Sequence, residues 1–436
     1  MSLIGVRGRI FTLDPERPFI KDGIVVFNIK KGVIEDVTSY EKGLEYGLEE
    51  VFGSSRSLVI PGLVNTHNHI PMYIFKGISI RRTGISWLKE IWRLESCLKP
   101  YHIYAGAIAG IAEMLLNGIT LFGDMYFYED EVVKACEEIG IRASLSLGVI
   151  ELFEGPPKHT IEESISFASR LNNNEGLVKG MIGIHALYSV SGDSIKMASE
   201  VSREREIRIH MHFAESRDEL EIVKKLYGTT PAEALEILRV LDTQPLLAHA
   251  VYVSNPDLEI LSRYKPFISY CPFTIMSWGS GIARIAEMIE KGIRITMGTD
   301  GPATAGWMNV LFEIKVAIAA QGSLYSTPYK LLPQDLLKHA IINGAKALGW
   351  EDVGIIKRGF KADLVVLEPI IPISIEDPDE ASYSLVYDFG LFSVRDVFIG
   401  GRHVVSNGKL LTIDLERLYI NMEEARRDIM DRCGRR

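Results

Sequence analysis

The middle of the chain alternates between short apolar runs and helical patterns, and this alternation limits the fold more than any other feature. Eight runs of β type are separated by helical patterns such as those over 101–117 and 231–241. The runs cover about 58–65, 119–124, 141–147, 180–185, 207–212, 245–249, 267–270 and 293–298. Strands that alternate with helices form a parallel sheet with helical crossovers. Eight of them predict an α/β fold with a closed (β/α)8 TIM barrel, with an open doubly wound sheet as the alternative.

Both ends of the chain differ from this middle, because they consist of short strands and turns. β-branched runs separated by Gly, Pro and Asp occur before residue 57 and again near 362–367 and 394–399. Neither end has enough strands to bury a core by itself. We therefore expect one small β-sandwich domain built from residues 1–57 and 357–415, rather than two separate β-appendages. The barrel then spans 58–356, and 416–436 forms a charged C-terminal helix.

Composition and charge exclude several classes of protein. The net charge of −9 argues against a nucleic-acid partner, which requires a basic face. No apolar run approaches the length of a membrane span, and the N-terminus lacks a signal-peptide core. The four cysteines are scattered without Cys-x-x-Cys spacing, which favours a reducing, cytoplasmic setting and no thiolate zinc site. We expect a small-molecule substrate as the partner, with no nucleic acid or membrane, and the sequence leaves room for a homo-oligomer.

Polar side chains gather at the ends of the predicted barrel strands. Residues 61–69 are PGLVNTHNH, and side chains at i and i+2 of a strand share a face, so His67 and His69 can direct two imidazoles at one point. The other such side chains at strand ends are His185, His210, His212, His249 and Asp300. The chain has ten histidines, and six of them are in this set. A buried structural role explains one or two of these, but not a set that converges on one face of a barrel.

This set of side chains fits a catalytic metal site. His67, His69, His212 and Asp300 can supply nitrogen and oxygen ligands. Ligands of this kind without a thiolate suit zinc, with iron or manganese as alternatives. They leave a position for water, and a divalent metal lowers the pKa of bound water from about 15.7 to about 7. Hydroxide would then be present at neutral pH.

Two further residues could move protons beside such a metal. His249 lies on the neighbouring strand, where it could orient or deprotonate the water. Glu215 follows His212 by three residues, well placed to shuttle a proton to the substrate. Plainer interpretations exist for two of these residues: Asp300 could be a turn aspartate, and Glu215 could be a helix-start acid favoured by the helix dipole. We assign His210, one step deeper on the strand of His212, to the core.

The chain resembles a known family at these positions. The matching segments are PGLVNTHNHIPM at 61–72, GITLFGDM at 118–125, HFAE at 212–215, AH at 248–249, SG at 280–281 and GTDG at 298–301. They are similar to the amidohydrolase superfamily, and within it to the branch of methylthioadenosine/S-adenosylhomocysteine deaminases and related chlorohydrolases. The resemblance covers nearly the full length, because GFKAD at 359–363 and GGR at 400–402 are similar to the sheet domain of that family.

The resemblance implies a set of roles around one metal ion. The implied ligands are His67, His69, His212 and Asp300. His249 and Asp300 would activate the water, and Glu215 would protonate the ring nitrogen under attack. His185 would contact the substrate, as would Glu95 in the family's Trp-Leu…Glu pattern. The implied reaction is attack of hydroxide on an amidine-like ring carbon, a tetrahedral intermediate and loss of ammonia.

Several loops depart from the family pattern. The segment 274–278 lacks the Asn that usually precedes Ser-Gly after strand seven, and 302–307 replaces a segment similar to Ser-Asn-Asn. The chain is apolar near Leu147, where homocysteine-binding relatives carry an arginine. Arg81 and Arg82 stand where acidic residues are common, and they could recognise an acidic substrate group or form a solvated loop. These differences leave the metal chemistry intact, but they argue against a simple transfer of the family's adenosine-type substrate to this chain.

Two classes of function remain open. The first is a metal-dependent hydrolytic deaminase of an amino-substituted N-heterocycle, either adenosine-type or another nucleobase-like small molecule. Hydrolysis of another C–N bond or of a C–Cl bond is the alternative within this class, because activated hydroxide attacks any of these electrophilic carbons. The second class is a non-catalytic barrel of the same ancestry. Such a barrel would be free to lose ligands, whereas this chain retains all of them together with Glu215 and His249.

Overall fold

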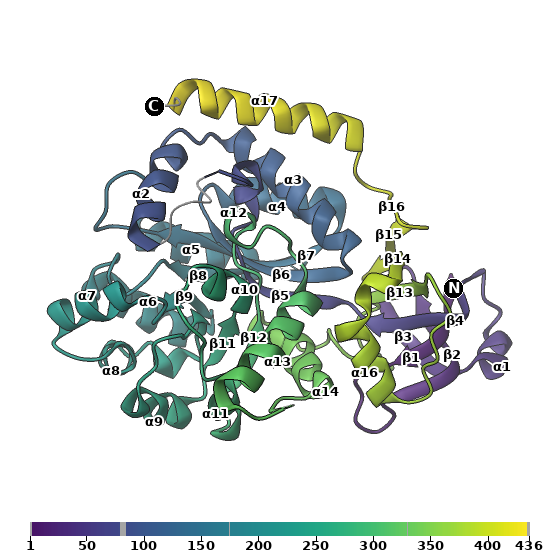
Figure 1. The fold of residues 1–436 in the computed structure, drawn as a ribbon. Coiled ribbons are helices and arrows are strands. Elements are labelled where there is room, and N and C mark those ends of the chain that lie inside the picture. Colours follow the sequence, from purple (N-terminus) through teal and green to yellow (C-terminus); the bar gives the residue numbers. More distant parts are fainter. Residues whose placement is uncertain (1, 79–83, 174, 329, 434–436) are drawn as a thin grey trace.

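The computed structural model describes residues 2–78, 84–173, 175–328 and 330–433. The chain forms two eight-stranded sheets, a parallel one from its middle and another from its two ends (Figure 1). The predicted α/β class, with a TIM barrel beside a smaller sheet domain, is confirmed. The predictions for Arg81 and Arg82 lie outside the described residues.

The parallel sheet is a nearly closed barrel in which the strands follow one another in chain order. Its strands are β5 (Leu63–Asn68), β6 (Ile119–Tyr126), β7 (Arg142–Val149), β8 (Val178–Ile184), β9 (Ile209–Phe213), β10 (Leu246–His249), β11 (Phe267–Tyr270) and β12 (Arg294–Met297). Side chains of β5, the first barrel strand, form hydrogen bonds with residues in and just after β12, the last barrel strand. Asn65 Oδ1 accepts a hydrogen bond from Thr299 N at 3.0 Å, and Thr66 Oγ1 donates to Met297 O at 2.9 Å.

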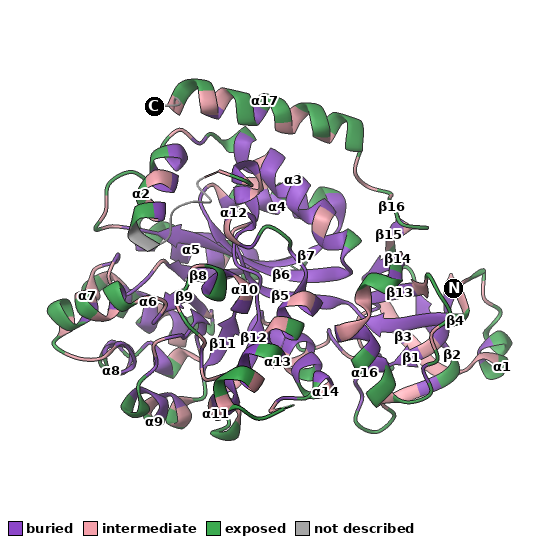
Figure 2. Cartoon of the chain, in the orientation of Figure 1, coloured by how far each residue is buried: buried purple, intermediate pink, exposed green. Residues whose placement is uncertain are grey.

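Helices surround the barrel with their apolar faces turned inward, and Figure 2 shows the buried strands inside this partly exposed layer. The longer helices around the barrel are α2 (Gly84–Glu95), α3 (Pro100–Leu116), α4 (Glu129–Ile139), α5 (Ile161–Asn172), α6 (Gly192–Arg205), α7 (Arg217–Tyr227), α9 (Asn255–Tyr264) and α13 (Val310–Tyr325). The shorter ones are α8 (Pro231–Ile237), α10 (Pro272–Ser277), α11 (Ile285–Glu290), α12 (Pro302–Ala305), α14 (Pro333–Lys338) and α15 (Gly344–Ala347). The remaining short helices are the 3-10 helices η2 (Ile70–Phe75) and η3 (Leu241–Thr243) and the π-helix η4 (His339–Asn343).

Strands from both ends of the chain pair in the second sheet, in the order β16-β15-β14-β13-β4-β1-β2-β3. They are β1 (Leu3–Phe11), β2 (Phe19–Asn28), β3 (Val33–Ser39), β4 (Glu50–Pro61), β13 (Leu364–Pro369), β14 (Phe392–Ile399), β15 (Arg402–Ser406) and β16 (Lys409–Leu410). Its short helices are α1 (Tyr40–Gly43), η1 (Leu44–Tyr46), α16 (Pro378–Tyr387) and η5 (Phe389–Leu391). The two ends share a separate core in which Val6 and Phe27 pack with Leu364 and Phe398. Each end therefore covers apolar surface of the other.

One strand assignment from the sequence is wrong. The run 58–65 was predicted as the first barrel strand, but Leu58, Val59 and Ile60 belong to β4 of the terminal sheet, where Val59 pairs with Ile10. The barrel strand β5 begins only at Leu63. The chain passes between the sheets at Gly62, where a Cβ atom would lie 1.8 Å from Thr120 Oγ1. Only glycine allows this close approach, which the apolar pattern does not reveal.

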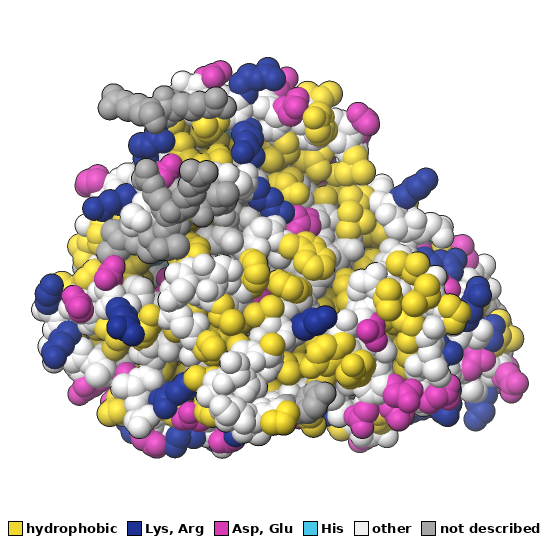
Figure 3. Space-filling model, in the orientation of Figure 1, with side chains coloured by type: hydrophobic (Ala, Val, Ile, Leu, Met, Phe, Trp, Pro, Cys, Tyr) yellow, Lys and Arg dark blue, Asp and Glu magenta, His cyan; other side chains and the backbone are white. Residues whose placement is uncertain are grey.

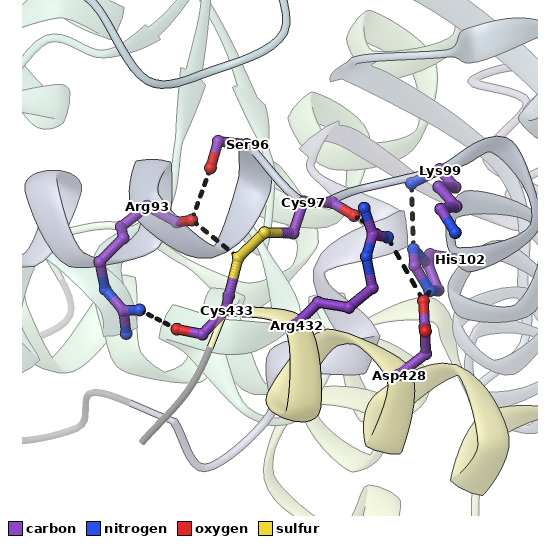
Figure 4. The surroundings of a disulfide bond; sticks show 8 residues. All are labelled: Arg93, Ser96, Cys97, Lys99, His102, Asp428, Arg432 and Cys433. Carbon is purple, nitrogen blue, oxygen red and sulfur yellow. Dashed lines mark hydrogen bonds and ion pairs between the residues drawn. A yellow bond between two sulfur atoms is a disulfide. The ribbon is translucent and has the colours of Figure 1, made fainter. Parts of the chain in front are cut away.

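A disulfide bond joins Cys97, just after α2, to Cys433 at the end of α17 (Leu415–Cys433), as Figure 4 shows. The two residues are 336 positions apart, so no short spacing in the sequence signals the pair. Cys136 and Cys271 are buried free thiols. The expectation of a reducing compartment depended on scattered cysteines, and this pair removes that argument.

Polar contacts and the disulfide hold α17 against the barrel, because its buried apolar residues among those described are only Ala425 and Ile429. Asp428 accepts hydrogen bonds from Tyr101 Oη at 2.5 Å and from His102 Nε2 at 3.1 Å. Beside the disulfide, Arg432 donates to Cys97 O at 2.9 Å and Arg93 donates to Cys433 O. The end of α2 and the end of α17 are thus tied together.

No helix in the described part of the chain is both long and apolar enough to cross a membrane. On the face shown in Figure 3, basic and acidic side chains are interspersed over the surface.

We expect the disulfide to contribute about 2–4 kcal/mol to the free energy of unfolding, because it restricts a very long loop in the unfolded chain. Denaturant unfolding of the wild type should therefore show lower stability after reduction by a dithiol. Cys433→Ser should match the reduced wild type and should not respond further to the dithiol. Equal stability of oxidised and reduced wild type would contradict the expected contribution.

Candidate active site and metal centre

The barrel brings the predicted strand-end residues together at one point. Two overlapping groups each offer ligand atoms within 4.8 Å of one another and could hold a metal ion. The groups are His67, His69 and His212, and His67, His249 and Asp300. They come from the ends of β5, β9, β10 and β12, because the carboxyl ends of parallel strands meet at one face of a barrel.

The ligand atoms face one another across short distances. His69 Nε2 lies 3.2 Å from His212 Nε2 and 3.5 Å from Asp300 Oδ1. His67 Nε2 lies 3.8 Å from the same Asp300 oxygen. Four ligand atoms that converge in this way match the chemistry of a zinc-type site, which uses imidazole nitrogens and carboxylate oxygens.

Backbone carbonyl groups orient two of these imidazoles. His69 Nδ1 donates to Met125 O at 2.6 Å, and His212 Nδ1 donates to His185 O at 2.8 Å. A histidine that donates from Nδ1 carries no proton on Nε2 when it is neutral. Both Nε2 atoms are therefore acceptors that point into the group, as metal-binding histidines require.

Burial keeps the imidazoles neutral. It lowers the pKa of His67 and His212 well below the usual value, and nearby imidazoles lower it further. Burial also lowers the pKa of His69 and His249, although Asp300 acts in the opposite direction on both. The buried His67 Nε2 has no hydrogen-bond partner within the described residues. Neutral imidazoles with an unused lone pair fit a metal ion.

Several backbone positions at these strand ends lie in the left-handed region. Asp300 has φ 64°, His249 has φ 79°, and Ala214 and Ala250 have φ 48° and φ 52°. Such conformations of non-glycine residues cost about 1–3 kcal/mol each and persist only when their surroundings enforce them. Their gathering at one end of the barrel indicates that the fold holds a specific geometry there.

Glu215 lies beside this His/Asp group at the pocket surface, with 21% of its side chain exposed. Its Oε1 is 3.9 Å from His249 Nε2. Burial, followed by the negative charge of Asp300, raises the pKa of Glu215 to about 8. Glu219 fixes the backbone here, since its carboxylate accepts hydrogen bonds from Ala214 N at 2.9 Å and Glu215 N at 2.8 Å. Glu215 can therefore hold a proton next to a bound molecule at neutral pH.

His185 and Glu95, the predicted substrate contacts, line the same pocket as His69, His212 and Asp300. His185 Nδ1 is 2.9 Å from Ser189 Oγ, and burial lowers the pKa of His185 to about 3. Glu95, the last residue of α2, accepts a hydrogen bond from Tyr126 Oη at 2.6 Å. Burial raises its pKa to about 7.

Six of the aromatic side chains that line the pocket are together called the aromatic wall. This aromatic wall consists of Trp87, Trp92, Phe127, Phe153, Tyr188 and Trp278. The ring centroids of Trp92 and Phe153 are 5.3 Å apart, and those of Trp87 and Trp278 are 5.1 Å apart. Flat apolar surfaces of this kind suit a planar ring held over a few polar groups.

The loop that departs from the family pattern after β12 still contacts the site. Asp300 Oδ2 accepts a hydrogen bond from Thr304 Oγ1 at 3.1 Å, and Oδ1 accepts one from Gly301 N at 2.6 Å. Thr304 also lines the pocket. The replaced segment therefore orients the carboxylate of Asp300.

Sequence reasoning missed several residues of the site. His210 was assigned to the core, but its Nε2 lies 2.9 Å from His67 Nδ1, and its position two residues before His212 was the available signal. Glu219 could have been found as an acid in the first turn of α7, next to the predicted Glu215. Of the aromatic wall, only Trp87 had a signal, as part of the Trp-Leu…Glu pattern, because the members come from distant loops and helices.

The sequence and fold of this chain match known proteins. A model of the amidohydrolase family matches residues 58–404. The chain belongs to the amidohydrolase family. The family membership predicted from the sequence motifs is thus confirmed.

Sequence relatives of the chain extend over most of its length. It is 33% identical to a 5-methylthioadenosine/S-adenosylhomocysteine deaminase of Dictyoglomus thermophilum, over 90% of this chain and 91% of the relative. It is 34% identical to a 5'-deoxyadenosine deaminase of Methanosarcina acetivorans, over 96% of this chain and 95% of the relative.

Solved structures show the same fold at lower identity. An adenosine deaminase from Xanthomonas campestris with bound zinc has a TM-score of 0.90 and 22% identity, with 98% of each chain covered. An atrazine chlorohydrolase from Arthrobacter aurescens, complexed with zinc, has a TM-score of 0.88 and 21% identity, with 97% of this chain and all of the other covered. The barrel with a terminal sheet is therefore shared with these proteins.

The raised pKa of Glu95 predicts how it affects stability across pH. The folded state holds this proton more tightly than the unfolded chain, where a glutamate titrates near about 4.3. The stability that the protonated carboxyl contributes is fully present below that value and is lost as the pH rises through about 7. Glu95→Gln keeps an oxygen acceptor for Tyr126 and cannot ionise. It should therefore lose less stability than the wild type between about pH 5 and pH 8.

Denaturant unfolding at several pH values measures this difference. Glu162→Gln, at an exposed position of α5, is the matched control and should follow the wild type. Parallel stability curves for Glu95→Gln and the wild type would show that Glu95 does not titrate in this range.

Proposed function

We propose that this protein is a metal-dependent hydrolytic deaminase that acts on an amino-substituted N-heterocycle of the adenosine type and releases ammonia. Family membership and deaminase relatives over nine-tenths of the chain support a hydrolase of C–N bonds other than peptide bonds. The observation that carries the proposal is a His/Asp group able to hold a metal beside a protonatable Glu215, which lines the same pocket as His69, His212 and Asp300.

The proposed cofactor is one divalent metal ion, with Zn²⁺ favoured over Fe²⁺ or Mn²⁺. Its ligands would be His67, His69, His212 and Asp300. The short distances among their ligand atoms and the neutral state of the imidazoles support this set. When bound, the metal supplies hydroxide at neutral pH, because it lowers the pKa of a coordinated water to about 7.

The protein's own residues then handle orientation and protons. His249 and Asp300 would orient the attacking water, since they lie at the carboxyl ends of β10 and β12 with their backbones fixed in the left-handed region. Glu215 would protonate the ring nitrogen as water adds to the adjacent carbon. Ammonia leaves when the exocyclic nitrogen has gained a proton, and the carbonyl forms in its place.

Substrate binding would use the aromatic wall and two polar groups. The aromatic wall would stack against the heterocycle and keep water out of the pocket. His185 and Glu95 would contact polar atoms of the substrate, because both side chains line the pocket with buried partners behind them. These partners hold the two side chains in place before the substrate arrives.

We expect the zinc-loaded protein to release ammonia from an adenosine-type nucleoside such as 5'-deoxyadenosine, measured in a coupled ammonia assay. Glu215→Gln should lower kcat by about 10²–10⁴-fold, because a carboxamide keeps the shape of the side chain and cannot transfer a proton. Glu221→Gln, on the outer part of α7 and away from the pocket lining, is the matched control and should keep full activity.

The assay separates the outcomes clearly. A loss of less than about tenfold in Glu215→Gln would exclude its role in proton transfer. Ammonia release from cytosine, guanine or pterin compounds but not from adenine nucleosides would move the proposal to another heterocycle. Chloride release from a chlorinated triazine without any deamination would replace it with hydrolysis of a C–Cl bond.

A further inference from the structure

Behind the metal-binding group, three buried side chains form a line of hydrogen bonds. His67 Nδ1 lies 2.9 Å from His210 Nε2, and His210 Nδ1 lies 3.1 Å from Ser146 Oγ. His210 comes from β9 and Ser146 from β7, next but one in the barrel. All three side chains are fully buried, and none of them lines the pocket.

The hydrogen bond between His67 and His210 determines which nitrogen of His67 can bind a metal. Nδ1 of His67 is already in contact with His210, whereas Nε2 faces Asp300 and has no hydrogen-bond partner among the described residues. A neutral imidazole that binds a metal through Nε2 carries its proton on Nδ1. That Nδ1–H must be accepted by a neighbour, and the neighbour here is His210 Nε2.

His210 can accept this hydrogen bond in only one of its two neutral tautomers. Its proton must sit on Nδ1, from which it donates to Ser146 Oγ. In the other tautomer, Nε2–H of His210 would donate to His67 Nδ1. His67 would then carry its own proton on Nε2 and could not bind a metal. The tautomers of the two histidines are therefore linked through one hydrogen bond.

This support differs from that of the other ligand histidines. His69 and His212 each donate to a backbone carbonyl, which is an acceptor in every state of the protein. His67 instead depends on the side chain of His210, which can accept in only one of its neutral tautomers. A substitution can remove this support without changing the backbone.

We infer that His210 is a positioning residue for the metal, and that together with Ser146 it fixes the tautomer and ring orientation of His67. The inference rests on the proposed metal centre, but not on the proposed reaction or substrate. Partners of this kind behind a metal ligand typically change metal affinity by about 10- to 100-fold when they are removed.

Three substitutions of His210 separate positioning from packing. The amide of glutamine reaches the place of Nε2 and can accept from His67, whereas the shorter asparagine reaches only the place of Nδ1. Leucine fills space without any polar atom. We expect zinc release to a chromogenic chelator to be about 10- to 100-fold faster in His210→Asn and His210→Leu, and close to wild type in His210→Gln.

Ser146→Ala tests the second hydrogen bond in a barrel that keeps every histidine. It removes an acceptor for the Nδ1–H that the required tautomer of His210 carries, so zinc release should be about tenfold faster. Ser144→Ala is the matched control on the same strand. Ser144 is equally buried and binds Leu348 O at 2.7 Å and Trp350 Nε1 at 3.1 Å, away from the histidines. Its loss should leave zinc release unchanged.

Several results would overturn the inference. Equal zinc release in His210→Gln and His210→Asn would show that the place of the acceptor does not matter. Wild-type release in a folded His210→Leu would show that no acceptor is needed. If the His210 variants do not fold, equal release from Ser146→Ala and Ser144→Ala decides against it. If the wild-type protein does not bind zinc, both the metal centre and this role of His210 are wrong. If it binds zinc but releases no ammonia, only the proposed reaction is wrong.

Discussion

The site depends on the exclusion of water from a cluster of imidazoles at one end of the barrel. The imidazole cluster consists of His67, His69, His210, His212 and His249. Ring centroids within it lie 4.9–5.5 Å apart, and burial lowers the pKa of every member. Charged imidazoles at this spacing would repel one another without solvent to screen them. The cluster therefore stays neutral, and its lone pairs are available to a metal ion.

The Nδ1 atoms of three of these imidazoles have hydrogen-bond partners, which the barrel supplies from behind. Carbonyl groups of Met125 and His185 hold two rings, and the line through His210 holds a third. The strand ends that carry Asp300 and His249 lie in strained backbone conformations, which the surrounding sheet must stabilise. His67 Nε2, which faces Asp300, is thus left without a hydrogen-bond partner among the described residues. This arrangement is typical of a binding site rather than of a core.

Much of this could be predicted from the sequence, because strand periodicity places residues at strand ends and the barrel brings those ends together. His67, His212 and Asp300 were predicted as ligands in this way, and the structure brings them together. Features that depend on close approach in three dimensions could not be predicted. The chain crosses from the terminal sheet to the barrel at Gly62, and the sequence does not show this crossing. The need for glycine there becomes visible only when Thr120 lies beside it in the fold. His210 and His212 occupy equivalent positions on one face of β9. The sequence therefore does not show that His210 contacts His67 from behind.

The most direct test of the account is an anomalous diffraction measurement at the zinc absorption edge on crystals of the zinc-loaded protein. The account predicts one strong peak per chain, about 2.0–2.2 Å from Nε2 of His67, His69 and His212 and from a carboxylate oxygen of Asp300. A peak coordinated by other residues, or no peak at the carboxyl end of the barrel, would contradict it.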